Sequence, residues 1–143
     1  RGPVWWTCRR PFRSVMKLLL DTHIALWAVT DSPRLPEAAR SAILASQNEV
    51  WISAASIWEI SIKHALGRGG MPISGTEALH WFTVSGYRHL PITSTHAAAV
   101  DALPAIHRDP FDRILIAQAQ TEPLRLVTHD EVIAQYSDIV MVV

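Results

Sequence analysis

The stretch LLLDTHIALW, Leu18 to Trp27, decides the fold of this 143-residue chain. Its three leucines predict a short buried strand, and the apolar residues that follow predict a helix over Thr22–Val29. An ionisable residue, Asp21, lies between these two elements. A charge beside apolar surface is unfavourable unless it is paired, so Asp21 either caps the helix or binds a cation.

The rest of the chain repeats this alternation of a short apolar strand with a helical pattern. We expect further strands at 50–52, 89–92, 124–128 and 139–142. We expect further helices at 35–47, 54–66, 76–85, 95–102, 110–120 and 130–135, and a glycine-rich loop at 68–75. Strands separated by helices favour a parallel sheet. The sequence therefore predicts a single α/β domain, with a short central parallel β-sheet flanked by helices on both faces.

The composition is that of a globular protein, with 49% hydrophobic and 18% charged residues. The single cysteine, Cys8, excludes an internal disulfide framework and a thiolate metal cluster, and it suits a reducing compartment. No run of about 18 uninterrupted apolar residues occurs, so we expect a cytoplasmic protein without a membrane-spanning helix.

Residues 1–15 differ from the rest of the chain. They hold four arginines and no acidic residue, and Met16 followed by Lys17 resembles a translation start. We therefore expect residues 1–15 to be a non-native or upstream leader that is poorly ordered, and residues 16–143 to be the folded domain. Without the leader, acidic side chains outnumber basic ones by four. That excess argues against a broad basic surface for nucleic acid.

Acidic residues recur where the predicted strands end. Asp21 and Asp130 each follow a strand directly, and Glu59 lies early in the helix after the second strand. Asp109 and Asp112 begin the helix that precedes the fourth strand. In open α/β sheets, ligands bind beyond the carboxyl ends of the strands. Four distant segments are therefore placed to bring carboxylates to one edge of the sheet.

Each of these acids also has a structural interpretation that the sequence leaves open. Asp21 and Asp130 are good helix caps. Glu59 fits either a capping box with Ser56 or an ion pair with Lys63 one turn later. Their common placement at strand ends is what favours a shared site.

Clustered carboxylates repel one another and destabilise a fold unless a hard cation neutralises them. Mg²⁺ prefers oxygen ligands and commonly shares its coordination with substrate phosphates. Such an ion activates a water and stabilises the leaving oxygen of a phosphodiester, and it lets a mildly acidic protein approach RNA. The motifs of dinucleotide-binding enzymes, P-loop proteins and serine hydrolases (G-x-G-x-x-G after the first strand, G-K-[ST] and G-x-S-x-G) do not occur.

Four motifs resemble those of the PIN-domain nucleases, and most closely those of the VapC-type toxins of bacterial type II toxin–antitoxin pairs. They are LLLDTH, SAASIWEISIKHALGR, HRDPFDRILIAQA and LVTHD, in that order across residues 16–143. The resemblance implies an endoribonuclease that depends on Mg²⁺ or Mn²⁺. It implies a catalytic and metal-binding site of four acids: Asp21, Glu59, Asp112 and Asp130.

The resemblance also implies an RNA substrate, a small cognate antitoxin that blocks the site, and a homodimer. Asp109 either assists the metal or phosphate, or only caps its helix. Thr22 and Thr128 either orient water or a carboxylate, or form only local turns. Arg113 and His107 are candidate phosphate contacts. For Arg113 the alternative is a salt bridge to a neighbouring acid.

The main rival hypothesis is a catalytically silent PIN-fold module that binds RNA or protein. Its sign would be a missing acid, and none of the four is missing. The seven histidines lack a zinc-ligand spacing such as H-E-x-x-H, which argues against a dedicated zinc site. His23 and His129 flank the acids, as phosphate contacts or as ordinary polar residues. For Trp27, core packing or a subunit interface is favoured over base stacking.

Overall fold

The computed structural model describes residues 15–67 and 70–143, so the expected leader, apart from Val15, lies outside the described residues. Five parallel strands form one sheet in the order β3-β2-β1-β4-β5. The strands are β1 Lys17–Leu20, β2 Glu49–Ser53, β3 Arg88–Leu90, β4 Arg125–Thr128 and β5 Val140–Val142. The predicted central parallel sheet is confirmed.

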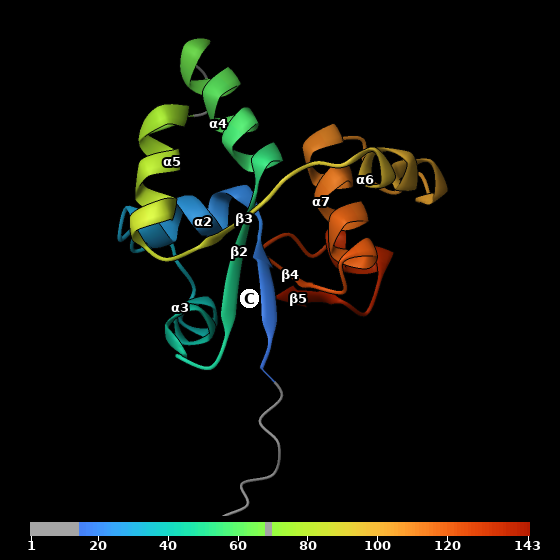
Figure 1. The fold of residues 1–143 in the computed structure, drawn as a ribbon, viewed down its shortest axis with the longest axis horizontal. Helices are drawn as coiled ribbons and strands as arrows, with labels where there is room; N and C mark the ends of the chain where they lie inside the picture. The colour runs from blue at the N-terminus through green and yellow to red at the C-terminus, as the bar shows by residue number, and fades with distance from the viewer. Residues whose placement is uncertain (1–14, 68–69) are drawn as a thin grey trace, which may run out of the picture.

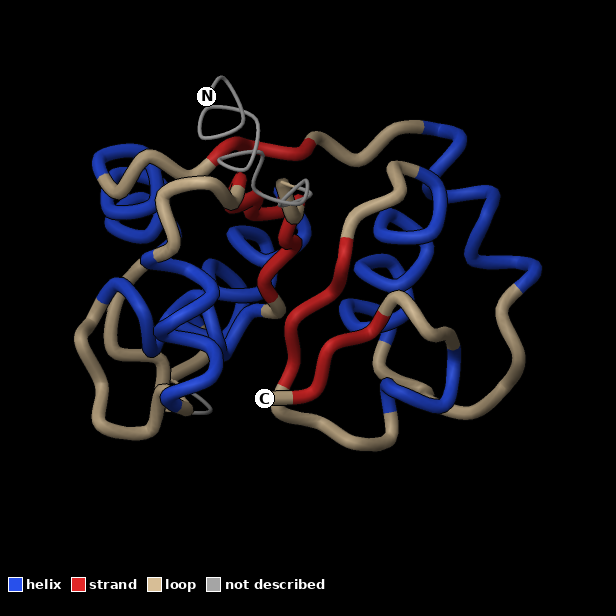
Figure 2. Tube along the Cα trace, turned by 90° about the horizontal axis from the view of Figure 1, so that it is seen from below, coloured by secondary structure: helices blue, strands red, loops and turns tan. Residues whose placement is uncertain are grey.

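Helices cover both faces of this sheet, with α2, α3 and α5 on one side and α6 and α7 on the other (Figure 1, and from below in Figure 2). The helices are α2 Thr22–Val29, α3 Glu37–Leu44, α4 Ala54–Ala65, α5 Gly75–Val84, α6 Ser94–Ala99 and α7 Pro110–Thr121. Two 3-10 segments, η1 Val100–Ala102 and η2 Ile133–Tyr136, complete the described elements. The predicted flanking of the sheet on both faces is confirmed.

The central strand β1 supplies side chains to both sides of the sheet. Leu18 and Leu20 belong to the core under α2, α3 and α5, whereas Leu19 belongs to the core under α7. All three are fully buried. Successive side chains of a strand point to opposite faces, so a strand covered on both faces is apolar throughout. This explains why the leucine run is continuous.

Three predicted helices differ from the observed ones at their ends. The helix expected at 35–47 is shorter as α3, because Ala45 is extended and the Asn48 side-chain amide donates to the Ala42 carbonyl (2.9 Å). The helix expected at 95–102 is α6 followed by η1, and the one expected at 130–135 is the 3-10 segment η2. Local side-chain hydrogen bonds of this kind compete with helix continuation.

The carboxyl ends of the strands lie at one edge of the sheet, because all the pairings are parallel. Helix α4 crosses this edge and contacts α2, α5 and α7. Its packing on α5 is close: a Cβ on Gly75 would lie 1.7 Å from Ser61 Oγ, so only glycine fits there. These contacts hold α4 at this edge, where its Glu59 meets Thr22 of α2.

Among the described residues, no helix has both the length and the apolar character that crossing a membrane requires.

Candidate active site

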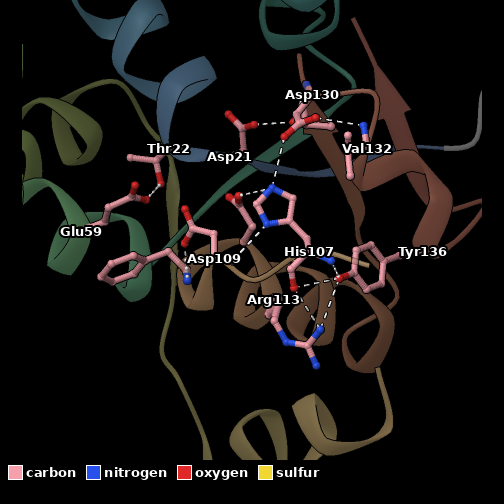
Figure 3. A network of polar contacts seen from close by, with 12 residues as sticks. Asp21, Thr22, Glu59, His107, Asp109, Arg113, Asp130, Val132 and Tyr136 are labelled. Atoms are coloured by element: carbon pink, nitrogen blue, oxygen red, sulfur yellow. Dashed lines mark hydrogen bonds and ion pairs between the residues drawn. The ribbon is translucent and has the colours of Figure 1, made fainter. Parts of the chain in front are cut away.

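The structure brings the four predicted acids together around one cavity of about 270 Å³. Asp21 follows β1, Glu59 lies on α4, Asp112 lies on α7 and Asp130 follows β4. The helix cap Asp109 lines the same cavity. Figure 3 shows Asp21, Glu59, Asp109 and Asp130 around a common space. The convergence expected from the strand ends is therefore present in the fold.

Asp21 is both a helix cap and a wall of the cavity. Its Oδ1 accepts the Ile24 amide proton (2.9 Å), and its Oδ2 accepts the Thr128 hydroxyl proton (2.5 Å). The residue is only 8% exposed. Burial raises the pKa of Asp21, while the hydrogen bonds from Thr128 and Ile24 act to lower it. The cap and the cation-binding interpretations are thus compatible.

Glu59 is buried, and both its oxygens are held. Thr22 donates its hydroxyl proton to Glu59 Oε1 (2.7 Å), and the Lys63 ammonium donates to Oε2 (2.5 Å). Thr22 is itself buried, with its hydroxyl 2.9 Å from Ser56 Oγ. The ion pair with Lys63 is therefore present, and Thr22 fixes the orientation of the carboxylate.

The alternative capping box of Ser56 and Glu59 is wrong. Helix α4 begins at Ala54, where Ser53 caps it by accepting the Ala55 amide proton (3.0 Å). Ser56 therefore lies inside the helix rather than at its start. The capping pattern alone does not locate a helix end when the preceding strand already supplies a capping serine.

His107 occupies a more central position than a peripheral phosphate contact would. Its Nε2 lies 3.4 Å from Asp112 Oδ2 and 3.5 Å from Asp130 Oδ2. Its Nδ1 accepts the Asp109 amide proton (3.1 Å), which places the proton of the neutral ring on Nε2. Ligand atoms of His107, Asp112 and Asp130 all lie within 4.8 Å of one another. The imidazole therefore lies between the two carboxylates.

Asp112 experiences the strongest charge crowding in the cavity. Burial and the charge of Asp109 raise its pKa to about 7, and His107 opposes this rise. Asp109 itself accepts the Phe111 amide proton as the cap of α7 (2.9 Å). At neutral pH the cavity therefore tends to retain a proton, which a bound cation would replace.

Asp112→Asn is expected to stabilise the metal-free protein in a pH-dependent way. The pKa of Asp112 is raised from its ordinary 3.8 to about 7, so the folded state loses stability as the pH rises between these values. The gain in Tm, measured in EDTA, should grow from pH 4 to pH 7 and remain constant above. Asp101→Asn, on exposed η1, should give no such trend. An equal gain at pH 5 and pH 8 would contradict the crowding.

Lys63 lies in the acidic cavity. The sequence indicated only its possible ion pair with Glu59, one helical turn earlier. Burial acts to lower its pKa, but the hydrogen bond and charge of Glu59 outweigh burial and raise it. The charges of Asp109 and Asp112 act in the same direction. The i, i+4 spacing from Glu59 was the signal for this contact; the proximity to α7 required the tertiary fold.

Arg113 binds backbone carbonyls instead of lining the cavity. Its guanidinium donates to the carbonyls of four residues in the segment before α7: Val100, Leu103, Pro104 and His107 (2.9–3.4 Å). It also donates to the Tyr136 hydroxyl, which in turn donates to the His107 carbonyl (both 3.3 Å). Among the described residues it forms no ion pair, so the alternative salt bridge is wrong. Arg113 fixes the segment that carries His107.

The donor set fits a hard divalent cation. The cavity offers carboxylate oxygens from four elements, two histidine rings also line it, and its lining contains no sulfur. Burial is the main cause of the raised pKa values of Asp21 and Asp112, and a bound cation would favour the ionised form of both carboxyls. These residues therefore fit Mg²⁺ or Mn²⁺ on their own chemistry.

Comparisons with known proteins agree with this geometry. The PIN domain family model matches residues 18–139. Ribonuclease VapC22 of Mycobacterium tuberculosis is 34% identical over 116 residues, which cover 79% of this chain and 86% of the relative.

Two solved structures share the fold at low identity. VapBC2 from Rickettsia felis, bound to a promoter DNA fragment, has a TM-score of 0.63 at 15% identity, covering 90% of this chain and 98% of that one. DNA-bound VapBC from Salmonella typhimurium has a TM-score of 0.64 at 16% identity, covering 90% and 98%. The family model spans most of the described residues, and ribonuclease VapC22 matches over most of both chains. The chain therefore belongs to the PIN-domain family and is of the VapC type.

Proposed function

We propose that this protein is a metal-dependent endoribonuclease that acts in the cytoplasm as the toxin of a toxin–antitoxin pair. The observation that carries the proposal is the single cavity lined by carboxylates from β1, α4, α7 and the end of β4. The similarity to ribonuclease VapC22 supports RNA as the substrate. The solved structures that share this fold include VapBC of Rickettsia felis and of Salmonella typhimurium, which supports an antitoxin partner.

In this proposal Asp21, Asp112 and Asp130 hold Mg²⁺ or Mn²⁺, and Glu59 completes the cluster or positions the attacking water. The bound ion supplies a water of lowered pKa and stabilises charge on the phosphate oxygens. The protein supplies orientation and no nucleophile of its own. Asp109 caps α7 and adds negative charge beside Asp112.

The side chains around the acids set the geometry before substrate arrives. The Thr128 hydroxyl holds Asp21, and the Thr22 hydroxyl holds Glu59. His107 directs Nε2–H toward Asp112 and Asp130. Hydrogen bonds from such neighbouring groups orient metal-binding carboxylates and tune their basicity. Lys63 is placed to balance the charge of Glu59.

The proposal includes a small antitoxin and a homodimer. A basic antitoxin side chain is complementary to the acidic cavity and would compete there with the metal or the RNA. Trp58 is 58% exposed and packs against Phe111, with ring centroids 5.3 Å apart, beside an apolar cavity of about 520 Å³. An exposed tryptophan beside an apolar cavity supports a contact with a second copy.

The test is cleavage of end-labelled structured RNA by the purified protein with Mn²⁺. We expect defined products that appear with Mn²⁺ or Mg²⁺ and disappear in EDTA, because the carboxylate cluster needs the cation to engage a phosphate. Sequencing the RNA ends would identify the cut positions. Binding of Mn²⁺ without any cleavage across a panel of structured RNAs would instead favour the catalytically silent module.

A further inference from the structure

A second cavity adjoins the acidic one. It has a volume of about 320 Å³, and its lining includes His23, Trp27, Thr30, Ser32 and Arg34. His23 also lines the acidic cavity, two residues after Asp21. A ligand chain that crosses His23 would therefore contact both spaces. We refer to this second space as the Trp27 cavity.

Trp27, which lines this cavity, has two aromatic neighbours: His23, which also lines it, and His129. The Trp27 ring centroid is 6.0 Å from that of His23 and 6.0 Å from that of His129, at interplanar angles of 51° and 71°. The two histidines are exposed, whereas Trp27 is half-buried and packs against the core. The tryptophan is thus held firmly while part of its ring remains accessible.

The third ring is held by the end of the chain. His129 Nδ1–H donates to the Val143 carbonyl (2.7 Å), and β4 and β5 end side by side near this point (Figure 2). His129 also directly precedes Asp130 of the acidic cavity. Rings that are fixed in place before binding lose little conformational entropy when a flat ligand stacks on them.

The Trp27 cavity differs from the acidic one in charge. Arg34 lines it, and among the described residues the Arg34 guanidinium takes part in no ion pair. An arginine beside an accessible aromatic ring is the chemistry of single-stranded nucleic acid binding, where bases stack on the ring and the cation contacts phosphate.

We propose that the Trp27 cavity binds one unpaired base of single-stranded RNA next to the scissile phosphate, with Arg34 on a neighbouring phosphate. This inference rests on the proposed ribonuclease activity and specifies where its substrate lies. Stacking on Trp27 accepts any base, because every base has a flat face, but it requires a base that is free of a duplex. One part of the Trp27 ring therefore packs against the core, and the accessible part stacks on the substrate base.

The test is a double-mutant cycle in which the Trp27 ring and one RNA base are removed separately and together, and the RNA affinity is measured each time. The probe is a fluorescein-labelled single-stranded decaribonucleotide of mixed sequence with Mg²⁺, in an Asp112→Asn background that prevents cutting. Trp27→Leu keeps an apolar side chain for the core and removes the stacking ring. We expect it to weaken binding about tenfold, whereas Trp81→Leu, an exposed tryptophan on α5, should leave binding unchanged.

Oligonucleotides with one abasic nucleotide at each position in turn complete the cycle. At one position the missing base should weaken binding to the Asp112→Asn protein about tenfold, yet change binding to the Trp27→Leu double variant less than twofold. Independent, additive losses would overturn the proposal. The proposal would also be overturned if Trp27→Leu weakened binding of the same strand in a duplex as much as it weakens binding of the single strand.

Two further variants test the proposal without changing Trp27 itself. His129→Ala should weaken binding several-fold, and Arg34→Ala should reduce the slope of log Kd against log salt by about one. Unchanged binding in both would overturn the proposal. If the parent cuts RNA while Trp27→Leu binds and cuts it normally, this inference fails and the ribonuclease function stands. If Trp27→Leu affects only inhibition by the cognate antitoxin, the cavity docks protein and the inference fails.

Discussion

Asp21→Asn is expected to reduce RNA cleavage at least ~1000-fold while the protein remains folded. The substitution removes one charge from the proposed metal site, and a metal ion contributes several kcal/mol to the transition state, at about 1.4 kcal/mol per tenfold in rate. Asparagine nearly preserves the shape and can still accept the Ile24 amide proton. Since burial raises the pKa of Asp21, removing the charge should not lower stability in EDTA. Single-turnover cleavage with Mn²⁺ measures the loss.

The matched control for this prediction is Asp101→Asn, the same chemical change on an exposed acid of η1. It should leave cleavage unchanged. Far-UV circular dichroism and Tm establish that both variants are folded. Cleavage by Asp21→Asn at the rate of the parent would show that the carboxylate of Asp21 has no part in the chemistry, and the four-acid site would then be wrong.

Arg113→Ala is expected to lower the free energy of unfolding by about 3 kcal/mol and the Tm by roughly 10 °C. The guanidinium donates to four backbone carbonyls, and a hydrogen bond that involves a charged group makes a net contribution of ~1.5–3 kcal/mol; because the four bonds share one side chain, their total lies well below the sum. The same change should slow cleavage, measured well below Tm, because His107 loses its support. Urea unfolding with and without Mn²⁺ measures the loss of stability, and cleavage by the folded protein measures the loss of activity.

Arg108→Ala is the control for this prediction, since Arg108 lies in the same segment and its side chain forms no hydrogen bond among the described residues. It should change Tm by no more than about 1 °C. Arg113→Lys keeps the charge but not the planar fork, and it should recover only a small part of the loss. A fully stable Arg113→Ala protein would mean that the segment before α7 holds its shape without the guanidinium.

Much of the architecture follows from local patterns in the sequence. The leucine run of β1 and the helix Thr22–Val29 agree with the structure to within a residue, because apolar periodicity and a capping aspartate are local signals. The carboxyl ends of parallel strands lie at the same edge of a sheet. The order of the acids relative to the strands therefore predicted that they meet at this edge.

Contacts between distant segments explain where the sequence interpretation failed. Arg113 stands beside Asp112 in the sequence, which favoured a salt bridge, yet its side chain turns to carbonyls as far back as Val100. The capping pattern of Ser56 and Glu59 was equally local; Ser53 caps α4 instead, and Glu59 accepts the hydroxyl proton of Thr22 on α2. Neither partner could be identified from neighbouring residues.

The amino-acid order alone determined the alternating strands and helices, the parallel sheet and the placement of the four acids toward one edge of it, because these depend on periodicity and capping within single segments. Only the tertiary structure decided that His107 lies between Asp112 and Asp130, that Lys63 enters the same cavity, and that Trp27 contacts the rings of His23 and His129. Side chains from separate elements meet at distances set by helix packing and loop conformation, and those depend on the whole fold.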